Sequence, residues 1–259
     1  MCYETSQLAY RIYKEAKRIH ASDEEIEYLR KRWEELSKGN EPQFYHVSGF
    51  SHPKLAALKS KKGKLEIDQF TWGLIPYWVK DELQAKELRD KTLNARGETI
   101  FEKPSFREAA RSSRLIIPLD GFYEHHHKAG KKYPFYIQRK DKRKMFIGGV
   151  SSDWNNQATG ELIRTLSIVT TKGNDMMKEI HNNPKIREPR MPLILNDEDC
   201  VKWLEGEEEE VVELIVPNVN IELDSHTVKK LRGKEYLGNC EEVKGEYVYE
   251  EMSDPPTLF

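Results

Sequence analysis

The residue with the most distinctive chemistry is Cys2, which directly follows Met1. If Met1 is removed, Cys2 carries an α-amine and a thiol on adjacent carbons, with ordinary pKa values of about 8 and about 8.5. Such an aminothiol condenses with an aldehyde through a Schiff base, after which the thiolate closes a thiazolidine ring. It can also act as an N-terminal nucleophile that serves as its own base. On Cys2 alone an incidental position is the favoured interpretation, because second residues are often poorly ordered.

Five further polar side chains occur within apolar or strand-like sequence. Asn94 and Arg96 belong to the run Asn-Ala-Arg, Glu124 ends the run Gly-Phe-Tyr-Glu, and His181 lies at a predicted helix end ahead of Arg190. Each has a structural explanation that is the more frequent one. The Asn could cap a helix N-terminus, the first Arg could form a surface ion pair, the Glu could face solvent, and the His could cap a helix C-terminus. Taken singly, none identifies an active site.

The run His125-His126-His127 raises the question of a metal. His125 and His127 would share one face of a strand, which suits two ligands. No carboxylate or Cys motif at a recognisable spacing supplies a third and fourth ligand. The sequence therefore predicts neither a metal nor another cofactor.

Aromatic residues and basic stretches are the candidates for contact with nucleic acid. The basic stretches are 59–64, 107–114 and 139–144. Trp72 is expected in the core, whereas Trp78, which follows Pro76 in a turn, is the better candidate for stacking on a base.

These residues need a scaffold that brings distant segments together. Alternating patterns predict short strands, and helical spacing predicts a helix over residues 7–19 and a second helix after the capping box at Ser22. Many short strands with interspersed helices predict an α+β fold. We expect a single domain over residues 1–259, built on a strongly curved, mostly antiparallel sheet or barrel-like core with flanking helices. Residues 253–259 are expected to form a loose tail.

Composition limits the classes of function. The chain has 259 residues, of which 33% are charged, and a formal net charge of −2, so binding to nucleic acid would need a local basic patch. The longest apolar runs are far shorter than the about 20 residues of a membrane span. Cys2, Cys200 and Cys240 are widely separated, which argues against a disulfide framework. With no recognisable targeting segment, a cytoplasmic location is expected.

In combination the motifs resemble one family. Trp-Gly-Leu-Ile-Pro-x-Trp at 72–78, Asn-Ala-Arg-x-Glu-Thr at 94–99, Gly-Phe-Tyr-Glu at 121–124 and the pair Ile-His and Arg-Met-Pro within 180–192 follow Met1-Cys2 in a fixed order. This order is similar to that of the SOS response-associated peptidase (SRAP) family. The resemblance covers nearly the whole chain. It implies a protein that cross-links to abasic sites in single-stranded DNA, with autopeptidase or abasic-site lyase chemistry as accessory activities.

The resemblance also implies roles for single residues. Cys2 would be the nucleophile that forms a thiazolidine. Asn94 would hold the N-terminal residue or the opened sugar, Glu124 would shuttle protons during Schiff-base formation, and His181 would protonate the sugar oxygen. Arg96 and Arg190 would contact phosphate, and Trp78 would lie by a kinked strand. The expected partner is single-stranded DNA that contains abasic sites, the expected state is a monomer, and neither a membrane nor a cofactor is expected.

The sequence departs from the family pattern in several places. Tyr3 and Glu4 stand where Gly and Arg are usual, and Glu4 would repel a phosphate. His125 stands where Trp is common, Val79 replaces a second Trp, and residues 183–189 form an insertion before Arg190. Two alternatives remain open. One is a thiol autopeptidase that removes only its own Met1, and the other is a module that binds single-stranded DNA without a covalent bond.

Overall fold

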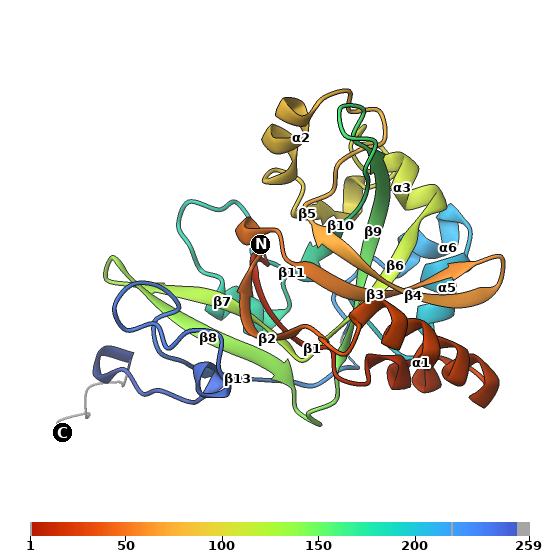
Figure 1. Ribbon diagram of the computed structural model, residues 1–259. Helices are drawn as coiled ribbons and strands as arrows, with labels where there is room; N and C mark the ends of the chain where they lie inside the picture. Colours follow the sequence, from red (N-terminus) through yellow and green to blue (C-terminus); the bar gives the residue numbers. More distant parts are fainter. Residues whose placement is uncertain (1, 219, 253–259) are drawn as a thin grey trace, which may run out of the picture.

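A closed ring of five strands forms the centre of the computed structural model, which describes residues 2–218 and 220–252. Each strand pairs with the next in the ring, and β9 pairs back with β10; only β10 and β4 are parallel. Three short strands extend the ring (Figure 1). The ring strands are β10 (Leu162–Lys172), β4 (Lys64–Trp72), β3 (Lys54–Lys61), β6 (Arg114–Leu119) and β9 (Met145–Asn155), and the additions are β5 (Asn94–Arg96), β11 (Arg190–Pro192) and β12 (Ile194–Leu195).

A second sheet carries the start of the chain and packs beside this barrel. Its strand order is β13-β8-β7-β1-β2, and all of its pairs are antiparallel. Residues Ala129 and Gly130, both with positive φ, form the turn of the β7–β8 hairpin. The bounds are β1 (Glu4–Leu8), β2 (Gln43–Ser48), β7 (Gly121–Lys128), β8 (Lys131–Arg139) and β13 (Leu223–Thr227).

Short helices cover the two sheets on the outside (Figure 1). The longest, α1, begins at the predicted capping box, in which Ser22 and Glu25 satisfy each other's backbone N–H. None of the helices in the described part of the chain is both long and apolar enough to cross a membrane. The helices are α1 (Asp23–Ser37), α2 (Glu82–Arg89), α3 (Arg107–Ser112), α4 (Asp175–Ile180), α5 (Asp199–Glu205) and α6 (Glu208–Glu213), and the 3₁₀ helices are η1 (Ile12–Ile19), η2 (Gly49–Ser51), η3 (Gly97–Thr99), η4 (Glu241–Lys244) and η5 (Glu250–Met252).

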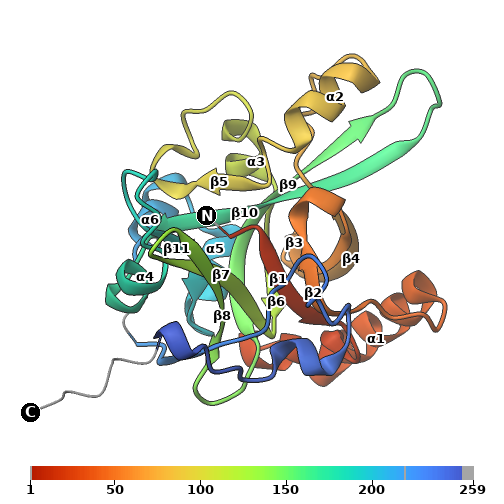
Figure 2. The ribbon, with the colours of Figure 1, turned by 90° about the vertical axis from the view of Figure 1, so that its left-hand side faces the viewer.

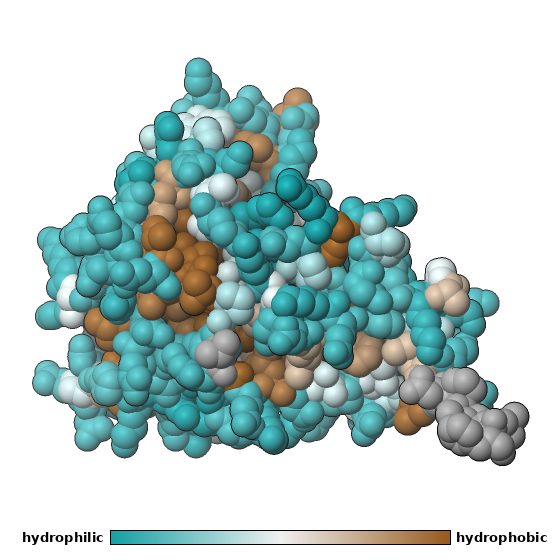
Figure 3. All heavy atoms as spheres, turned by 180° about the vertical axis from the view of Figure 1, so that it is seen from behind, coloured by the Kyte–Doolittle hydropathy of each residue, from teal (hydrophilic) through white to brown (hydrophobic). Residues whose placement is uncertain are grey.

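The architecture confirms the predicted fold class, an α+β fold with a barrel-like core and flanking helices. The core includes Trp72, which is fully buried as expected. The face opposite to the view of Figure 1 is mostly hydrophilic, as the high content of charged residues requires (Figure 3). The tail expected over residues 253–259 lies outside the described residues.

The helix predicted over residues 7–19 is wrong in its first part. Residues 4–8 form the strand β1 between β2 and β7, and only the part from Ile12 onwards is helical, as a 3₁₀ helix. The sequence did not indicate this strand, because a buried strand is recognised by apolar residues and here the fully buried positions include Thr5 and Gln7. The Gln7 side chain donates to the carbonyl oxygens of Ala56 and Pro118 and accepts from the backbone N–H of Ala56, so its burial leaves no amide atom unpaired.

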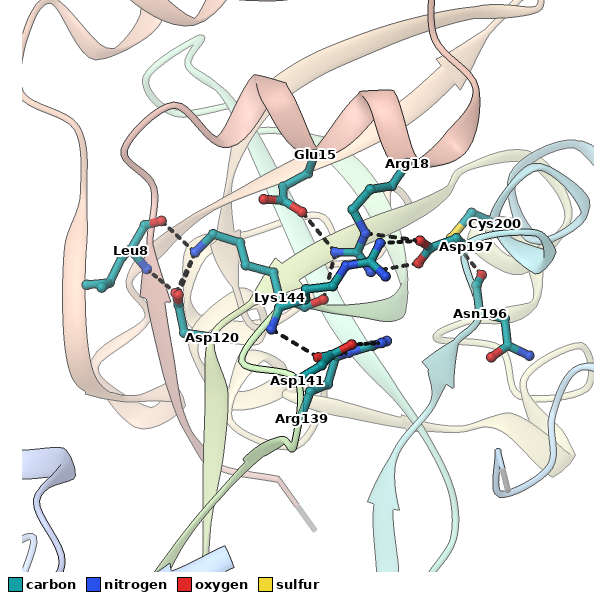
Figure 4. Close-up of polar contacts among 11 residues, drawn as sticks. Leu8, Glu15, Arg18, Asp120, Arg139, Asp141, Lys144, Asn196, Asp197 and Cys200 are labelled. Atoms are coloured by element: carbon teal, nitrogen blue, oxygen red, sulfur yellow. Dashed lines mark hydrogen bonds and ion pairs between the residues drawn. The ribbon is translucent and has the colours of Figure 1, made fainter. Parts of the chain in front are cut away.

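A polar network anchors the far end of β1 (Figure 4). Lys144 donates to the Leu8 carbonyl oxygen at 2.8 Å and to both carboxylate oxygens of Asp120 at 2.7 Å. The Leu8 N–H completes the group with a 2.6 Å bond to Asp120. Beside it, Arg18 of η1 pairs with Asp197 at 2.6 Å, which joins the N-terminal segment to the start of α5. Held in this way, β1 presents its other end, with Cys2, to the barrel.

Candidate active site

Cys2 precedes β1 and packs in one core cluster with barrel residues such as Leu55 and Trp72. Figure 2 shows this end of the chain beside β10. Cys2 is 1% exposed, and its thiol lies 3.8 Å from the Glu4 carbonyl oxygen. The side chain of Asn94, on β5, donates a 2.8 Å hydrogen bond to the Cys2 carbonyl oxygen. Burial, reinforced by the charge of Glu124, raises the pKa of the Cys2 thiol. The thiol is therefore protonated at neutral pH in this environment.

Strand register brings Glu124 to the same place. The antiparallel pair β1–β7 sets Glu4 opposite Tyr123, so the chain runs from Glu4 towards Cys2 alongside Glu124. Glu124 is 8% exposed, and burial raises its pKa although the His125 backbone N–H donates to it at 3.1 Å. This carboxyl group holds its proton more tightly than an ordinary Glu does.

His181 ends α4 and lies directly against Glu124. Its Nδ1 is 3.5 Å from Glu124 Oε2, and the backbone N–H of Arg190 meets the same nitrogen at 3.3 Å. Burial lowers the pKa of His181 to about 4, so the ring is neutral at pH 7. A carboxyl group whose pKa is raised by burial, beside a neutral imidazole, can take up and release a proton during a reaction.

A cavity of about 390 Å³ opens beside these groups. Its floor carries Glu124 and His181, and its walls come from both sheets and from the loop after α4. His125 and His127, which share a face of β7, also line it, and the described residues contain no group of three or more side chains suited to hold a metal ion. The lining consists of Tyr3, Glu4, Phe50, Tyr123, Glu124, His125, His127, Lys132, His181, Asn183, Ile186, Glu188, Arg190 and Arg232.

Glu4, expected to repel a phosphate, lies in the wall of this cavity and is 2% exposed. Its carboxylate is 2.9 Å from Arg232 Nη2, 3.7 Å from His46 Nε2 and 3.8 Å from His125 Nδ1. Burial disfavours the charged form, but the nearby His46 ring, the charge of His125 and the hydrogen bond from Arg232 hold the pKa of Glu4 at about 2. Glu4 is thus an internal, compensated charge.

The three residues expected to contact DNA differ in their surroundings. Arg96 is exposed at the end of β5, and Trp78 is 39% exposed, with its Nε1 3.4 Å from the Pro104 carbonyl oxygen. Arg190 is 3% exposed and donates two 2.7 Å hydrogen bonds to the carboxylate of Glu98. A phosphate at Arg190 would therefore have to compete with that carboxylate.

Two of the basic stretches are partly used within the fold. Arg114 is buried and donates to the carbonyl oxygens of Trp203 and Ala110. In the 139–144 turn, Arg139 pairs with Asp141 at 2.5 Å and Lys144 anchors β1 as described above. These three cations serve the packing of the chain.

Arg232, Lys132 and Phe50 line the cavity but were not singled out from the sequence. Arg232 follows Lys229 and Lys230 in a polar segment without any motif, and Lys132 follows the turn of a hairpin, where charge usually reflects solvation. Phe50 is 50% exposed and stacks on Tyr3 with ring centroids 5.1 Å apart. The break in strand pattern at Gly49 was the only local signal for this position.

Comparison with known proteins identifies similar sequences in several organisms. The chain is 41% identical over 139 residues to the abasic site processing protein YoqW of Bacillus subtilis, a match that covers 53% of this chain and 57% of that protein. It is 28% identical over 173 residues to the abasic site processing protein HMCES of Gallus gallus, covering 58% of this chain and 49% of that protein. The chain thus spans about half the length of these curated relatives.

Solved structures and a family model extend the match. A crystal structure of a protein from Bacteroides thetaiotaomicron superposes with a TM-score of 0.78 at 31% identity, covering 95% of this chain and all of that one. A protein from Bordetella bronchiseptica shares the fold, with a TM-score of 0.66 at 24% identity, covering 88% of this chain and all of that one. The family model described as "SOS response associated peptidase (SRAP)" matches residues 10–234. The chain therefore belongs to the SRAP family.

Proposed function

We propose that this protein processes abasic sites in single-stranded DNA by forming a covalent thiazolidine between Cys2 and the aldehyde of the opened sugar. The observation that carries the proposal is the position of Cys2, which Asn94 holds and which lies close enough to Glu124 for that charge to raise the pKa of the thiol. Cys2 is buried behind the cavity, whose lining includes Glu124 and its neighbour His181. The names of the relatives support the substrate class, because both are described as abasic site processing proteins.

The proposed reaction has three steps, and each needs a group found at this site. The closed sugar opens to the aldehyde as the bond from C1 to the ring oxygen breaks. His181 gives a proton to the ring oxygen, and the anomeric hydroxyl gives up its own proton, which returns to His181 through Glu124. The α-amine of Cys2, in the form of the chain that begins there, adds to the aldehyde carbon and then releases water to form an imine. Glu124 takes the proton from the attacking amine and returns it to the departing water. The thiol then adds across the C=N bond, so that sulfur bonds to carbon and the thiol proton passes to nitrogen.

The raised pKa of the Cys2 thiol favours this order of events. A buried thiol that keeps its proton is a weak nucleophile, so the amine attacks first. Formation of the imine next to the thiol then makes ring closure intramolecular, which compensates for the low fraction of thiolate. A thiazolidine also removes the imine from which β-elimination of the DNA strand would start, so strand cleavage is the competing outcome.

The DNA strand is proposed to approach along the rim of the cavity. Arg96 is exposed and would contact phosphate, and Trp78 would stack on a base next to the gap left by the missing base. Arg190 would contribute a phosphate contact only if its bidentate pair with Glu98 opens.

Removal of Met1 is a precondition, and we propose that the chain removes it by its own Cys2. The family's description as a peptidase and the deep burial of Cys2 favour self-cleavage over trimming of the folded protein by an aminopeptidase. Intact mass of protein made in a translation system without methionine aminopeptidase tests this. Loss of Met1 from wild type and its retention in Cys2→Ala are expected, and retention in wild type would exclude self-cleavage.

A denaturing gel tests the main proposal. Protein that begins at Cys2 is mixed with a single-stranded oligonucleotide that contains one abasic site, and a slowly migrating band is expected. Cys2→Ala should abolish the band, whereas Cys200→Ala, a matched change at another buried cysteine, should leave it. An undiminished band in Cys2→Ala would contradict the proposal. Binding that is salt-sensitive and unchanged in Cys2→Ala, with no covalent band for wild type, would indicate the non-covalent module instead.

A further inference from the structure

Glu4 and Arg232 form an ion pair in which one side chain is buried and the other is exposed. The Glu4 side chain is 3% exposed, whereas that of Arg232 is 71% exposed at the mouth of the cavity. An arginine has five N–H donors. Among the described residues, Glu4 is the sole hydrogen-bond partner of Arg232, through Nη2 at 2.9 Å. Most of the guanidinium is therefore available to a ligand, while the buried Glu4 carboxylate holds one of its nitrogens, Nη2.

The segment that carries Arg232 is itself attached to the second sheet. The Asn239 side chain accepts hydrogen bonds from the backbone N–H groups of Tyr45 and His46, at 2.7 Å and 3.2 Å. The Tyr236 hydroxyl lies 2.8 Å from Nδ1 of His46, whose other nitrogen faces Glu4. The position of Arg232 is thus set from two sides, which reduces the entropy lost when it binds a ligand.

A second cation faces the same space. Lys132, at the start of β8, lines the cavity and is exposed. Arg232, Lys132 and His125 line the same cavity. Burial lowers the pKa of His125, the charges of Glu4 and Glu124 raise it, and those of Arg232 and Lys132 lower it. No ion pair is recorded for Lys132 within residues 2–218 and 220–252. Glu4 offsets one of the two positive charges, and the remaining, partly exposed carboxylate of the lining, Glu188, lies 3.5 Å from Arg190 and 3.8 Å from Lys172.

We propose that Arg232 and Lys132 bind a backbone phosphate next to the damaged nucleotide, and that Glu4 is the positioning residue that holds Arg232 in place. This inference rests on the proposed function of the same cavity. A guanidinium binds a phosphodiester through parallel N–H···O bonds, and a lysine adds a point charge. In this arrangement Glu4, expected from the sequence to repel a phosphate, holds the arginine that binds one.

Equilibrium binding separates this inference from the covalent chemistry. The probe is a single-stranded oligonucleotide with a tetrahydrofuran abasic analogue, which has no aldehyde and cannot cross-link. Arg232→Ala is expected to weaken binding by about tenfold at low salt. It should also make the slope of log K against log salt shallower by about 0.7, the value for one phosphate contact on a single strand. Lys132→Ala should show the same trend.

Two variants test the role of Glu4 and guard against misfolding. Glu4→Gln keeps the charge of Arg232 but loosens it, so weaker binding with an unchanged salt slope is expected. The double variant Glu4→Gln with Arg232→Ala leaves no orphan carboxylate and should reproduce the slope change of Arg232→Ala. Arg32→Ala is the matched control, because Arg32 is 39% exposed and pairs with one carboxylate, Glu35, on α1, away from the cavity.

The outcomes are distinguishable from those of the proposed function. If Arg232→Ala and the double variant bind the analogue with wild-type affinity and slope, the phosphate role is wrong, even if wild type still cross-links natural abasic DNA. If the salt slopes of wild type and the variants differ as expected but wild type never cross-links, the phosphate role is supported and the covalent function is wrong. If wild type does not bind the analogue at any salt concentration, both are overturned.

Discussion

The side-chain amide of Asn94 donates a 2.8 Å hydrogen bond to the carbonyl oxygen of Cys2, across a sequence separation of 92 residues. The bond joins β5, which pairs in parallel with β10, to the head of β1. Cys2 is therefore positioned from the barrel as well as from its own strand, and this contact orients its amine and thiol for the chemistry proposed above.

Replacing Asn94 by Ala should slow cross-linking more than it affects folding. One neutral hydrogen bond is worth about 1 kcal/mol, so a roughly fivefold lower single-turnover rate at saturating DNA is expected. The backbone pairing of β5 is unaffected, and DNA affinity should change little. Asn196→Ala, which removes a 3.2 Å contact with Asp199 at the start of α5, is the control and should react like wild type.

Replacing Glu124 by Gln tests its role as a base. Because burial raises the pKa of Glu124, the cross-linking rate of wild type should rise with pH through a value above the ordinary range of a Glu. Glu124→Gln should lower the rate by about 10²-fold or more and remove this acid limb. A pH–rate profile measured under single-turnover conditions provides the comparison. An unchanged profile in the variant would exclude Glu124 as the titrating group.

His181 should make the free energy of unfolding depend on pH in a defined window. Its folded pKa of about 4 lies below the ordinary histidine value of 6.5, so the unfolded chain binds more protons between these pH values. Stability from this source is complete above pH 6.5 and is lost as the pH falls towards 4, by roughly 3 kcal/mol. Urea unfolding of wild type and His181→Gln at pH 7 and pH 4.5 measures the difference.

The contribution of Glu4 to the free energy of unfolding also falls as the pH falls, but at lower pH than that of His181. The two contributions can therefore be separated. The pKa of Glu4 is lowered from 4.5 to about 2, so its contribution is lost only below pH 4.5. A loss of stability in His181→Gln between pH 6.5 and 4.5 as large as that in wild type would contradict the assignment to His181.

Arg190 should contribute to the stability of the fold through its ion pair with Glu98. Arg190→Ala leaves Glu98 without its bidentate partner and should reduce the free energy of unfolding by about 2–3 kcal/mol, less than for a fully buried pair because the Glu98 side chain is 34% exposed. The double variant Arg190→Met with Glu98→Gln should recover part of this loss. If the salt slope of DNA binding in the double variant equals that of wild type, Arg190 does not contact phosphate.

Trp78 should contribute to affinity through stacking. Trp78→Ala is expected to weaken binding of single-stranded DNA by about 1–3 kcal/mol, whereas Trp78→Phe should retain much of the affinity, because both rings offer an aromatic face. Tyr28→Ala, a change of another half-exposed aromatic residue on α1, is the control. Equal affinity of wild type and Trp78→Ala would place the DNA strand elsewhere.

The sequence by itself determined the fold class and the family. Alternating patterns marked most of the ring strands, the capping box marked the start of α1, and Trp72 was correctly assigned to the core. These features are local, because side-chain periodicity and capping depend on neighbours within a few residues. The order of the motifs identified the family without any structure.

The tertiary structure decided how charges and polar groups are paired. Residues 4–8 form a buried strand because Gln7 finds partners in β3 and β6. No pattern within four polar residues and one Leu could indicate those partners. Glu4 and Arg232 are 228 residues apart, and Arg190 meets Glu98 instead of solvent. The ionisation of a buried group depends on desolvation and on charges within a few ångströms. These depend on which distant segments the fold brings together, and the sequence alone does not fix them.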